Sequence, residues 1–526
     1  MHLDIKDHDF KWPFEVVADR ENIGPEKGKP YFGNPPVFLK RIDMKKKSEA
    51  EFNLLFNPRS IALIGASNNI GKWGAIVFLN IILGGYQGRI YPVNPKEEAI
   101  FGYRAYAQVS RIPDPVDLAI IAVPAQRAMG AVLDCIQKGI RMAIVITSDF
   151  SETGEEGARL EKELTGTARA SGMRVIGPNT MGIFSASASL TALMPPVRPR
   201  RGNVSLVSQS GNIGTQMLGW GEQFGVGFCK YVSSGNEGDL RSEDFLSFFG
   251  KDEETKVILT YLEGLDDGRE FLRMAKEVTP RKPIVAFKGG KTLAGARAAK
   301  SHSGAMAGVN VVYEAAFRQG GITRASTAEE MLEWAAAFSS LPLPKGNRVG
   351  ILTRGGGWGV IAADACQQMG LEVPPLEERV IREMDAFLPR YWSRGNPVDM
   401  VATLGADSYV RCLELLISWE KVDAVISLSG DTALLNAVLS DVQKRAEILI
   451  PPEKMEQVRQ LASASRAQIY QRMGELMEKY GKPIFSVGAN PPAFTFAQFR
   501  SPERAAKAAG KLYEYSRYRQ AIGVER

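Results

Sequence analysis

The sequence has little of the chemistry that marks disulfides, structural metal sites and membrane spans. Its 526 residues include only four cysteines, which lie far apart and form no CxxC pair. We therefore expect neither a metal site nor disulfides, and a protein of the reducing cytoplasm. The longest apolar runs, such as 119–124 and 143–147, are far shorter than the ~20 residues of a membrane-spanning helix. The first residues, MHLDIKDHDFKWPFEV, mix both charge signs, so no secretory signal is expected there.

Clustered charge of one sign is also scarce. The net charge of +6 is a mild excess spread along the whole chain. A nucleic-acid binder usually has a basic stripe with interleaved aromatic residues. The basic run RPRR at 198–201 lies among prolines and is interpreted as a linker. We expect no nucleic-acid partner, whereas a small polyphosphate ligand would suit the modest positive balance.

Three similar segments recur along the chain at intervals of about 145 residues. Each is a short apolar run followed by a turn rich in Gly, and they occupy residues 59–67, 203–214 and 347–359. One domain for each segment agrees with the usual size of ~100–200 residues per domain. With an aperiodic N-terminal extension before them, the predicted parts of the chain are 1–50, 51–200, 201–343 and 344–526.

Apolar strands alternate with amphipathic helices within these parts. In the first, LAIIAVP at 118–124 precedes a stretch with apolar residues at helical spacing, which ends at Gly139. Strands that are apolar throughout and separated by such helices indicate parallel sheets covered on both faces. We predict an α/β fold of three doubly wound domains, with ligands bound at the carboxyl ends of the strands.

The three glycine-rich turns are candidate anion sites. A turn from a buried strand into a helix exposes unpaired backbone N–H groups at the positive end of the helix dipole. The first turn keeps Gly65, Gly71 and Gly74 and offers Lys72 to a phosphate, but it lacks the GxGxxG spacing of dinucleotide dehydrogenases. The second, SQSGNIG at 208–214, places two hydroxyl groups before a helix start. Each turn alone could equally be a tight strand–helix connection.

Histidine is scarce, and His302 is the only one outside the predicted N-terminal extension. It lies in KSHSGAMAG, among glycine, alanine and serine. No second His or Cys stands at metal-ligand spacing, and no GxSxG motif of a Ser-His-Asp hydrolase accompanies it. A lone histidine is more often structural, but a loop of small residues suits a side chain that receives a large anion. We expect the imidazole to attack phosphorus and become phosphohistidine.

Glu263 is the best candidate for the acceptor that fixes the tautomer of a nucleophilic imidazole. It directly follows the apolar strand VILTYL and precedes Gly264, so it should project from the carboxyl edge of a sheet. We predict that Glu263 orients His302. The alternative, an exposed acid in a loop, fits the neighbouring Asp266 and Asp267 better.

Motifs along the chain resemble those of the ADP-forming acyl-CoA synthetases, which include acetyl-CoA synthetase and, more distantly, succinyl-CoA synthetase. The resemblance extends from about residue 54 to about residue 515. Its most specific motifs are GPNTMG at 177–182 and SHSGAMAG at 301–308. Further matches are GASNNIGKWG, YPVNPK, IAVPA, SQSGNIG, SSGNEGD, YLEG, GNPVDM and SPERAAKA. The family implies a Rossmann CoA-binding domain followed by two flavodoxin-like domains.

The resemblance also implies roles for individual residues. Those that would line coenzyme A are Gly65, Ser67, Lys72, Asn94, Lys96, Val123, Pro124 and Ala125. Those that would surround the reacting thioester and inorganic phosphate are Asn179, Ser208, Gln209, Ser210, Gly211, Gly235, Asn236 and Glu237. His302 falls where the family carries its phosphohistidine, and Glu263 where it has the glutamate that orients this histidine.

As an α subunit of this family, the chain would interconvert acyl-CoA, ADP and phosphate with a carboxylic acid, CoA and ATP. In the family, ATP-grasp domains bind Mg-ADP and Mg-ATP. About 40 residues remain after the third α/β unit, too few for an ATP-grasp unit of roughly 200, so a separate ATP-grasp β subunit is expected. Two alternatives stay open: a CoA-binding regulatory protein of synthetase ancestry without turnover, and a nicotinamide-dependent dehydrogenase, which the broken GxGxxG disfavours.

Overall fold

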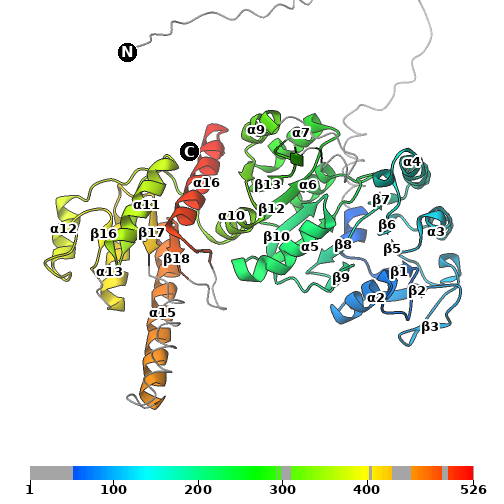
Figure 1. Cartoon of the computed structure of the whole chain (residues 1–526), viewed down its shortest axis with the longest axis horizontal. Coiled ribbons are helices and arrows are strands. Elements are labelled where there is room, and N and C mark those ends of the chain that lie inside the picture. Colours follow the sequence, from blue (N-terminus) through cyan, green and yellow to red (C-terminus); the bar gives the residue numbers. More distant parts are fainter. Residues whose placement is uncertain are drawn as a thin grey trace, which may run out of the picture. The chain divides into compact units, whose positions relative to one another are not determined.

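The computed structural model in Figure 1 describes residues 51–524 except 293, 296, 298–309, 402–404, 429–451 and 489–495. Residues 49–526 form one compact unit. Three sheets, each built on five parallel strands, make up the framework of the described residues, and a fourth sheet is a two-stranded ribbon of β3 (Ala99–Ile100) and β4 (Tyr103–Arg104). None of the helices in these described residues is both long enough and apolar enough to cross a membrane.

The first sheet has five parallel strands in the order β2-β1-β5-β6-β7. Numbered within the sheet this is 2-1-3-4-5, a doubly wound order with its switch point between β1 and β5. The inner strands SIALI, LAII and MAIV are buried at every position, as parallel strands covered on both faces should be. Its strands are β1 (Ser60–Ile64), β2 (Arg89–Val93), β5 (Leu118–Ile121), β6 (Met142–Val145) and β7 (Arg174–Ile176).

Three helices accompany this sheet. They are α2 (Trp73–Leu83), α3 (Ala125–Lys138) and α4 (Glu155–Ala170). Helix α3 ends where the sequence predicts, because Gly139 adopts the left-handed conformation with φ of 83° that commonly stops a helix.

The second sheet repeats the 2-1-3-4-5 order in its parallel strands and adds an antiparallel hairpin at one edge. The parallel strands are β10 (Arg201–Ser208), β11 (Phe228–Ser233), β12 (Val257–Leu262), β13 (Ile284–Lys288) and β14 (Thr323–Ala325). The hairpin of β8 (Gly182–Ser185) and β9 (Leu190–Leu193) pairs with β11. These strands precede residue 200, yet they belong to the second sheet; the domain bounds given above stay a prediction.

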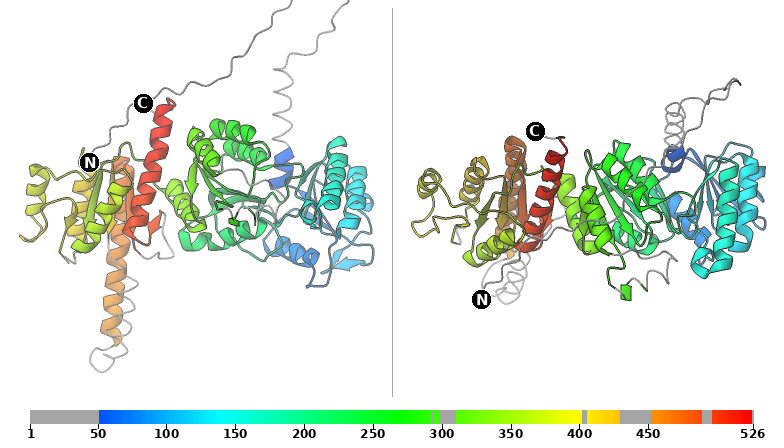
Figure 2. Two further views of the ribbon diagram at one scale, coloured as in Figure 1. Left: turned by 45° about the horizontal axis from the view of Figure 1, so that its top comes forward. Right: turned by 90° about the horizontal axis from the view of Figure 1, so that it is seen from above.

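Helices cover both faces of the second sheet (Figure 2). They are α5 (Gly211–Trp220), α6 (Ser242–Lys251), α7 (Gly268–Val278), α9 (Asn310–Gln319) and α10 (Ala328–Ser340). One apolar core extends from the first sheet into this one, since Phe78 of α2 and Phe245 of α6 belong to the same buried cluster.

The third sheet has the order β16-β15-β17-β18-β19, again 2-1-3-4-5 and all parallel. Its strands are β15 (Val349–Thr353), β16 (Val398–Asp399), β17 (Ala424–Leu428), β18 (Ile484–Val487) and β19 (Gln498–Phe499). Its helices are α11 (Gly356–Gln368), α12 (Glu378–Asp385), α13 (Ala406–Ser418), α15 (Pro452–Tyr480) and α16 (Pro502–Ala521).

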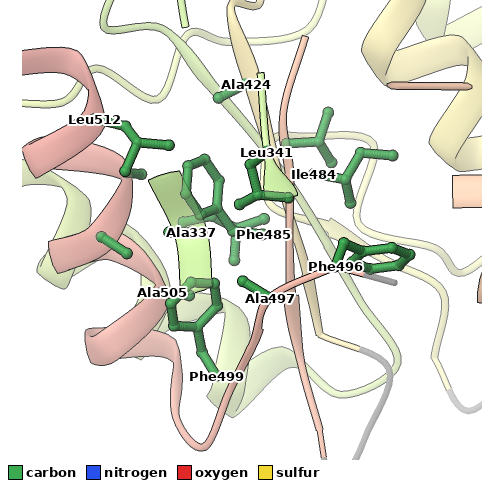
Figure 3. Close-up of a cluster of buried hydrophobic side chains, with 14 of the residues drawn as sticks. Ala337, Leu341, Ala424, Ile484, Phe485, Phe496, Ala497, Phe499, Ala505 and Leu512 are labelled. Atoms are coloured by element: carbon green, nitrogen blue, oxygen red, sulfur yellow. The ribbon is translucent and has the colours of Figure 1, made fainter. Parts of the chain in front are cut away.

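Helix α16 attaches the third sheet to the second. Figure 3 shows Leu341, which follows α10, together with Phe485 of β18 and Leu512 of α16 in one apolar cluster. Arg504 of α16 also forms an ion pair with the buried Glu333 of α10, at 2.9 Å. The three predicted doubly wound α/β units are thus confirmed.

Candidate active site at the carboxyl edges of the first two sheets

A cavity of about 810 Å³ lies at the carboxyl ends of strands from both the first and the second sheet. Its walls come from the turns after β5, β6 and β7 and from the turns after β10, β11 and β12. Ligands of doubly wound sheets bind at this edge. Ten residues predicted from the sequence line it: Val123, Pro124, Asn179, Gln209, Ser210, Gly211, Gly235, Asn236, Glu237 and Glu263.

The N-terminus of α5 supplies backbone N–H donors to this cavity. Ser210 precedes the helix, and its side chain forms no capping hydrogen bond to the first turn. The buried Ser208 shapes the turn, because its hydroxyl donates to the carbonyl of Ser210 at 2.6 Å. A Cβ on Gly211 would lie 2.2 Å from Cγ of Met181, so this position admits only glycine. An uncapped helix N-terminus that lines a cavity is suited to bind a phosphate.

The loop after β11 also lines the cavity. Gly235 has φ of 61°, and a Cβ there would lie 2.3 Å from the carbonyl oxygen of Pro178. Asn236 accepts from the Asn179 side-chain amide at 3.2 Å and donates to the carboxylate of Glu161 at 2.9 Å. The loop is therefore bonded to the first sheet, and its conformation requires glycine.

Glu237 is a carboxyl group held by hydroxyl donors. Ser234 donates to its Oε1 at 2.7 Å, and the Ser242 hydroxyl does so at 2.6 Å. Burial raises the pKa of Glu237, and these hydrogen bonds oppose that rise. A carboxyl group with these hydrogen bonds cannot rotate freely, so it stabilises the shape of the cavity wall.

Ion pairs to a buried carboxylate join the first sheet to the loop after β11. Asp239, whose side chain is 1% exposed, accepts from Nε of Arg169 and from Nε of Arg174, each at 2.9 Å. It also accepts from the backbone N–H of Val175 at 2.9 Å. Both arginines belong to the first sheet and its helices, whereas Asp239 follows the Gly235 loop, so this contact ties that loop to the first sheet.

The turns after β1 and β5 meet at the switch point of the first sheet. Gly65 has φ of 89°, and a Cβ there would lie 2.4 Å from the carbonyl oxygen of Ala122. A Cβ on Gly74 in α2 would in turn lie 2.0 Å from the carbonyl oxygen of Gly65. The glycines singled out in the sequence therefore serve close packing of backbone at the place where such sheets bind nucleotides.

Asn94 ties the turn after β2 to the same place. Its side-chain amide donates to the carbonyl of Ala66 at 2.8 Å and accepts from the N–H of Lys96 at 2.9 Å. Ser67 stabilises the first turn, since its hydroxyl accepts from the N–H of Asn69 at 3.1 Å. Seven residues predicted from the sequence are not among the described residues that line the cavity: Gly65, Ser67, Lys72, Asn94, Lys96, Ala125 and Ser208.

Glu263 lies where the sequence predicts, directly after β12 and on the cavity wall. Glu263 is 7% exposed. The pKa of the neighbouring Tyr261 is raised to about 12, first by burial and then by the negative charge of Glu263. His302, the residue that Glu263 is expected to orient, lies outside the described residues.

Several lining residues were missed by the sequence reasoning. Thr147 follows β6 as Glu263 follows β12, so the same rule would have found it; its hydroxyl donates to the carbonyl of Val123 at 2.6 Å. Trp73 lines the cavity with an exposure of 52%, although no pattern in the sequence marks it. Met194 follows the antiparallel strand β9, which a rule for parallel strands does not reach.

Two family models match the chain. Residues 59–186 match a CoA binding domain, and residues 201–338 match a succinyl-CoA ligase like flavodoxin domain. The first contains the switch-point turns, and the second contains the N-terminus of α5 together with Glu263.

Individual relatives match over most of the chain. The α subunit of ADP-forming acetate–CoA ligase II of Pyrococcus furiosus is 46% identical over 71% of this chain and 81% of its own length. The α subunit of ligase I from the same organism is 39% identical over 88% of this chain and 98% of its own length.

A solved structure is similar in fold as well. Acetyl-coenzyme A synthetase 1 of Ca. Korarchaeum cryptofilum, in complex with phosphate and ADP, superimposes with a TM-score of 0.77 at 34% identity, covering 90% of this chain and 98% of that one. With both domains, the sheet topology and nearly the whole length of an α subunit in common, this chain belongs to the family of ADP-forming acyl-CoA ligase α subunits.

Proposed function

We propose that this chain is the α subunit of a cytoplasmic, ADP-forming acyl-CoA synthetase that interconverts acyl-CoA, ADP and phosphate with a carboxylic acid, CoA and ATP. The observation that carries the proposal is that the uncapped N-terminus of α5, Glu263 and the side chains of Asn179 and Asn236 line one cavity. Family membership supports the same activity.

CoA occupies the carboxyl edge of the first sheet in this proposal. Its nucleotide lies along the turns of Gly65, Asn94 and Val123, and its thioester enters the cavity. Gly65 supports this placement because the backbone there approaches its neighbours too closely for any side chain. Lys72, directly before α2, and Lys96 are available to phosphate groups of CoA.

The first chemical step takes place in the cavity. An oxygen of inorganic phosphate attacks the thioester carbonyl, the carbon–sulfur bond breaks, and CoA leaves as the thiol while an acyl phosphate remains. The N–H groups at the start of α5, near Ser210 and Gly211, stabilise the charge on the phosphate. Because these donors are already fixed in place, they need no rearrangement during the reaction.

The second step uses His302 as the nucleophile. Its unprotonated nitrogen attacks phosphorus, the bond from phosphorus to the acyl oxygen breaks, and the carboxylic acid leaves. Glu263 holds the other ring nitrogen and stabilises the positive charge that develops on the ring. Phosphohistidine then transfers its phosphoryl group to ADP, and the histidine returns to its starting form.

A separate β subunit with an ATP-grasp fold is proposed to bind Mg-ADP. The two Pyrococcus relatives are themselves α subunits, which supports the need for a partner. The acyl group is that of a small carboxylic acid, since the cavity must also hold the end of CoA.

Co-expression with an ATP-grasp chain from the same genome tests this proposal. The purified complex should convert ATP to ADP in the presence of CoA and a carboxylic acid, in a panel from acetate to aryl acids. Neither subunit alone should turn over. A chain that binds CoA but supports no turnover with its partner would instead be a regulatory protein, and tight binding of NADH in place of CoA would indicate a dehydrogenase.

A further inference from the structure

The backbone of Glu263 is held from both sides by two side chains, one half-buried and one buried, that have no part in the mechanism above. Its N–H donates to Oε1 of Gln209 at 2.5 Å, and its carbonyl accepts from Nζ of Lys288 at 2.8 Å. We propose that Gln209 and Lys288 are positioning residues, which fix Glu263 and thereby the histidine that it orients. This inference rests on the proposed function of Glu263.

The side-chain amide of Gln209 uses its full hydrogen-bonding capacity within the protein. Its oxygen accepts from the N–H groups of Glu263 and Gly264, the latter at 3.1 Å. Its nitrogen donates to the carbonyl of Gly264 at 2.8 Å and to the carboxylate of Glu237 at 3.1 Å. A primary amide has two donor protons and two acceptor positions, so none is left for a ligand. Gln209 therefore acts through Glu263 and Glu237 rather than on phosphate.

The location of Gln209 couples two parts of the site. It stands between Ser208 and Ser210, in the turn that leads into α5. A shift of this turn would move Glu263 together with the phosphate-binding N–H groups. The phosphate site and the residue that orients the nucleophile thus form one rigid unit.

Lys288 is a buried cation at the carboxyl end of β13, with 2% of its surface exposed. Its ammonium group donates to the carbonyls of Glu263 and Gly289 and lies 4.8 Å from the centre of the Tyr313 ring. Burial lowers the pKa of Lys288, and the charge of Glu263 opposes this change. Burying an ammonium group costs free energy of desolvation. Its contact with the Glu263 carbonyl therefore points to a role in the site.

Matched variants separate positioning from general stability. Gln209→Met removes all four hydrogen bonds, whereas Gln216→Met changes an exposed glutamine on α5. Lys288→Met is matched by Lys282→Met, because Lys282 lies before β13 and donates to the carbonyls of Phe249 and Asp252. Of these four residues, Gln209 and Lys288 hydrogen-bond to the backbone of Glu263, whereas the hydrogen bonds of Gln216 and Lys282 go to other residues.

The main measurement is the rate at which the chain forms phosphoenzyme from acyl-CoA and phosphate. Gln209→Met and Lys288→Met should each slow it about 100-fold, as expected when a reacting group is displaced by about 1 Å. Their Kd for CoA, measured by calorimetry, should stay within about twofold of the unmodified chain, and both controls should keep the rate. A normal rate in either variant, or an equal loss in Lys282→Met, would overturn the assignment.

Hydrogen exchange provides a test that does not depend on activity. The amides of Glu263 and Gly264 should exchange at least about tenfold faster in Gln209→Met than in Gln216→Met. Unchanged protection would refute the contact even if the rate falls. If the unmodified chain forms no phosphoenzyme while this exchange result holds, the proposed function fails and the positioning contact stands.

Discussion

Replacement of Glu243 by Gln should stabilise the protein, and more so as the pH rises. Glu243 lies in the first turn of α6 and is 8% exposed. Burial raises its pKa from an ordinary value of 4.5 to about 7, and the nearby charges of Glu237 and Asp244 add to this effect. The folded protein therefore holds a proton on Glu243 at a pH where the unfolded chain has lost it.

The size of the effect follows from these two pKa values. Between pH 4.5 and pH 7 the folded state binds more protons than the unfolded state, so the stability of the unmodified protein falls as the pH rises. Glutamine has the same shape and does not titrate. The gain in stability from Glu243→Gln should therefore grow by about 2.5 kcal/mol between pH 5 and pH 8.

Urea unfolding at pH 5, 6.5 and 8, followed by circular dichroism, measures this difference as a shift in midpoint. Glu156→Gln is a control for which the change in stability should have the opposite sign, because the ion pair with Arg159 lowers the pKa of the exposed Glu156. That variant should be less stable than the unmodified protein at pH 8, and the difference should vanish in acid. A loss of stability in Glu243→Gln at pH 8 would show that the buried carboxylate is ionised and paired, and would refute the reasoning.

Three further variants probe the cavity. Asp239→Ala should cost about 1–3 kcal/mol, because it removes the buried carboxylate that accepts from Arg169, Arg174 and the N–H of Val175; an unchanged thermal midpoint would contradict this. Gly211→Ala should prevent phosphoenzyme formation but preserve CoA affinity, since its Cβ would collide with Met181 and displace the start of α5; normal labelling would count against the phosphate site. Trp73→Ala should raise the Kd for CoA about fivefold through loss of an aromatic contact, as measured by calorimetry, and an unchanged Kd would remove the indole from the binding site.

Much of the fold could be predicted because the sequence repeats a local pattern. The apolar runs in 59–67, 203–214 and 347–359 became β1, β10 and β15, and each is the first of five parallel strands that have the same order in their sheet. Continuous apolar runs and the turns after them are local features, so they can be read without knowing the tertiary structure.

The hairpin of β8 and β9 shows where such reasoning ends. Its short strands precede residue 200, but they pair with β11 more than forty residues later, as in the pair Ile183 and Val232. Pairing over such a distance is decided by tertiary packing, which no local pattern records. For the same reason the sequence did not reveal that Met194 would line the cavity.

The candidate site was predictable to the extent that its residues follow parallel strands. Glu263 was found by its position after an apolar strand, whereas the hydrogen bonds that saturate Gln209 depend on groups from two other loops, after β11 and after β12. The sequence could identify a site residue, but it could not show which groups its polar atoms would hydrogen-bond to. The role of His302 stays a prediction, since it lies outside the described residues.

Radiolabelled phosphate tests the central claim most directly. Incubation of the chain with acyl-CoA and labelled phosphate should leave covalent label that is lost in acid and kept in base, and His302→Asn should abolish it. His8→Asn, which changes a histidine of the N-terminal extension, should label normally. Label that persists in His302→Asn would contradict the account.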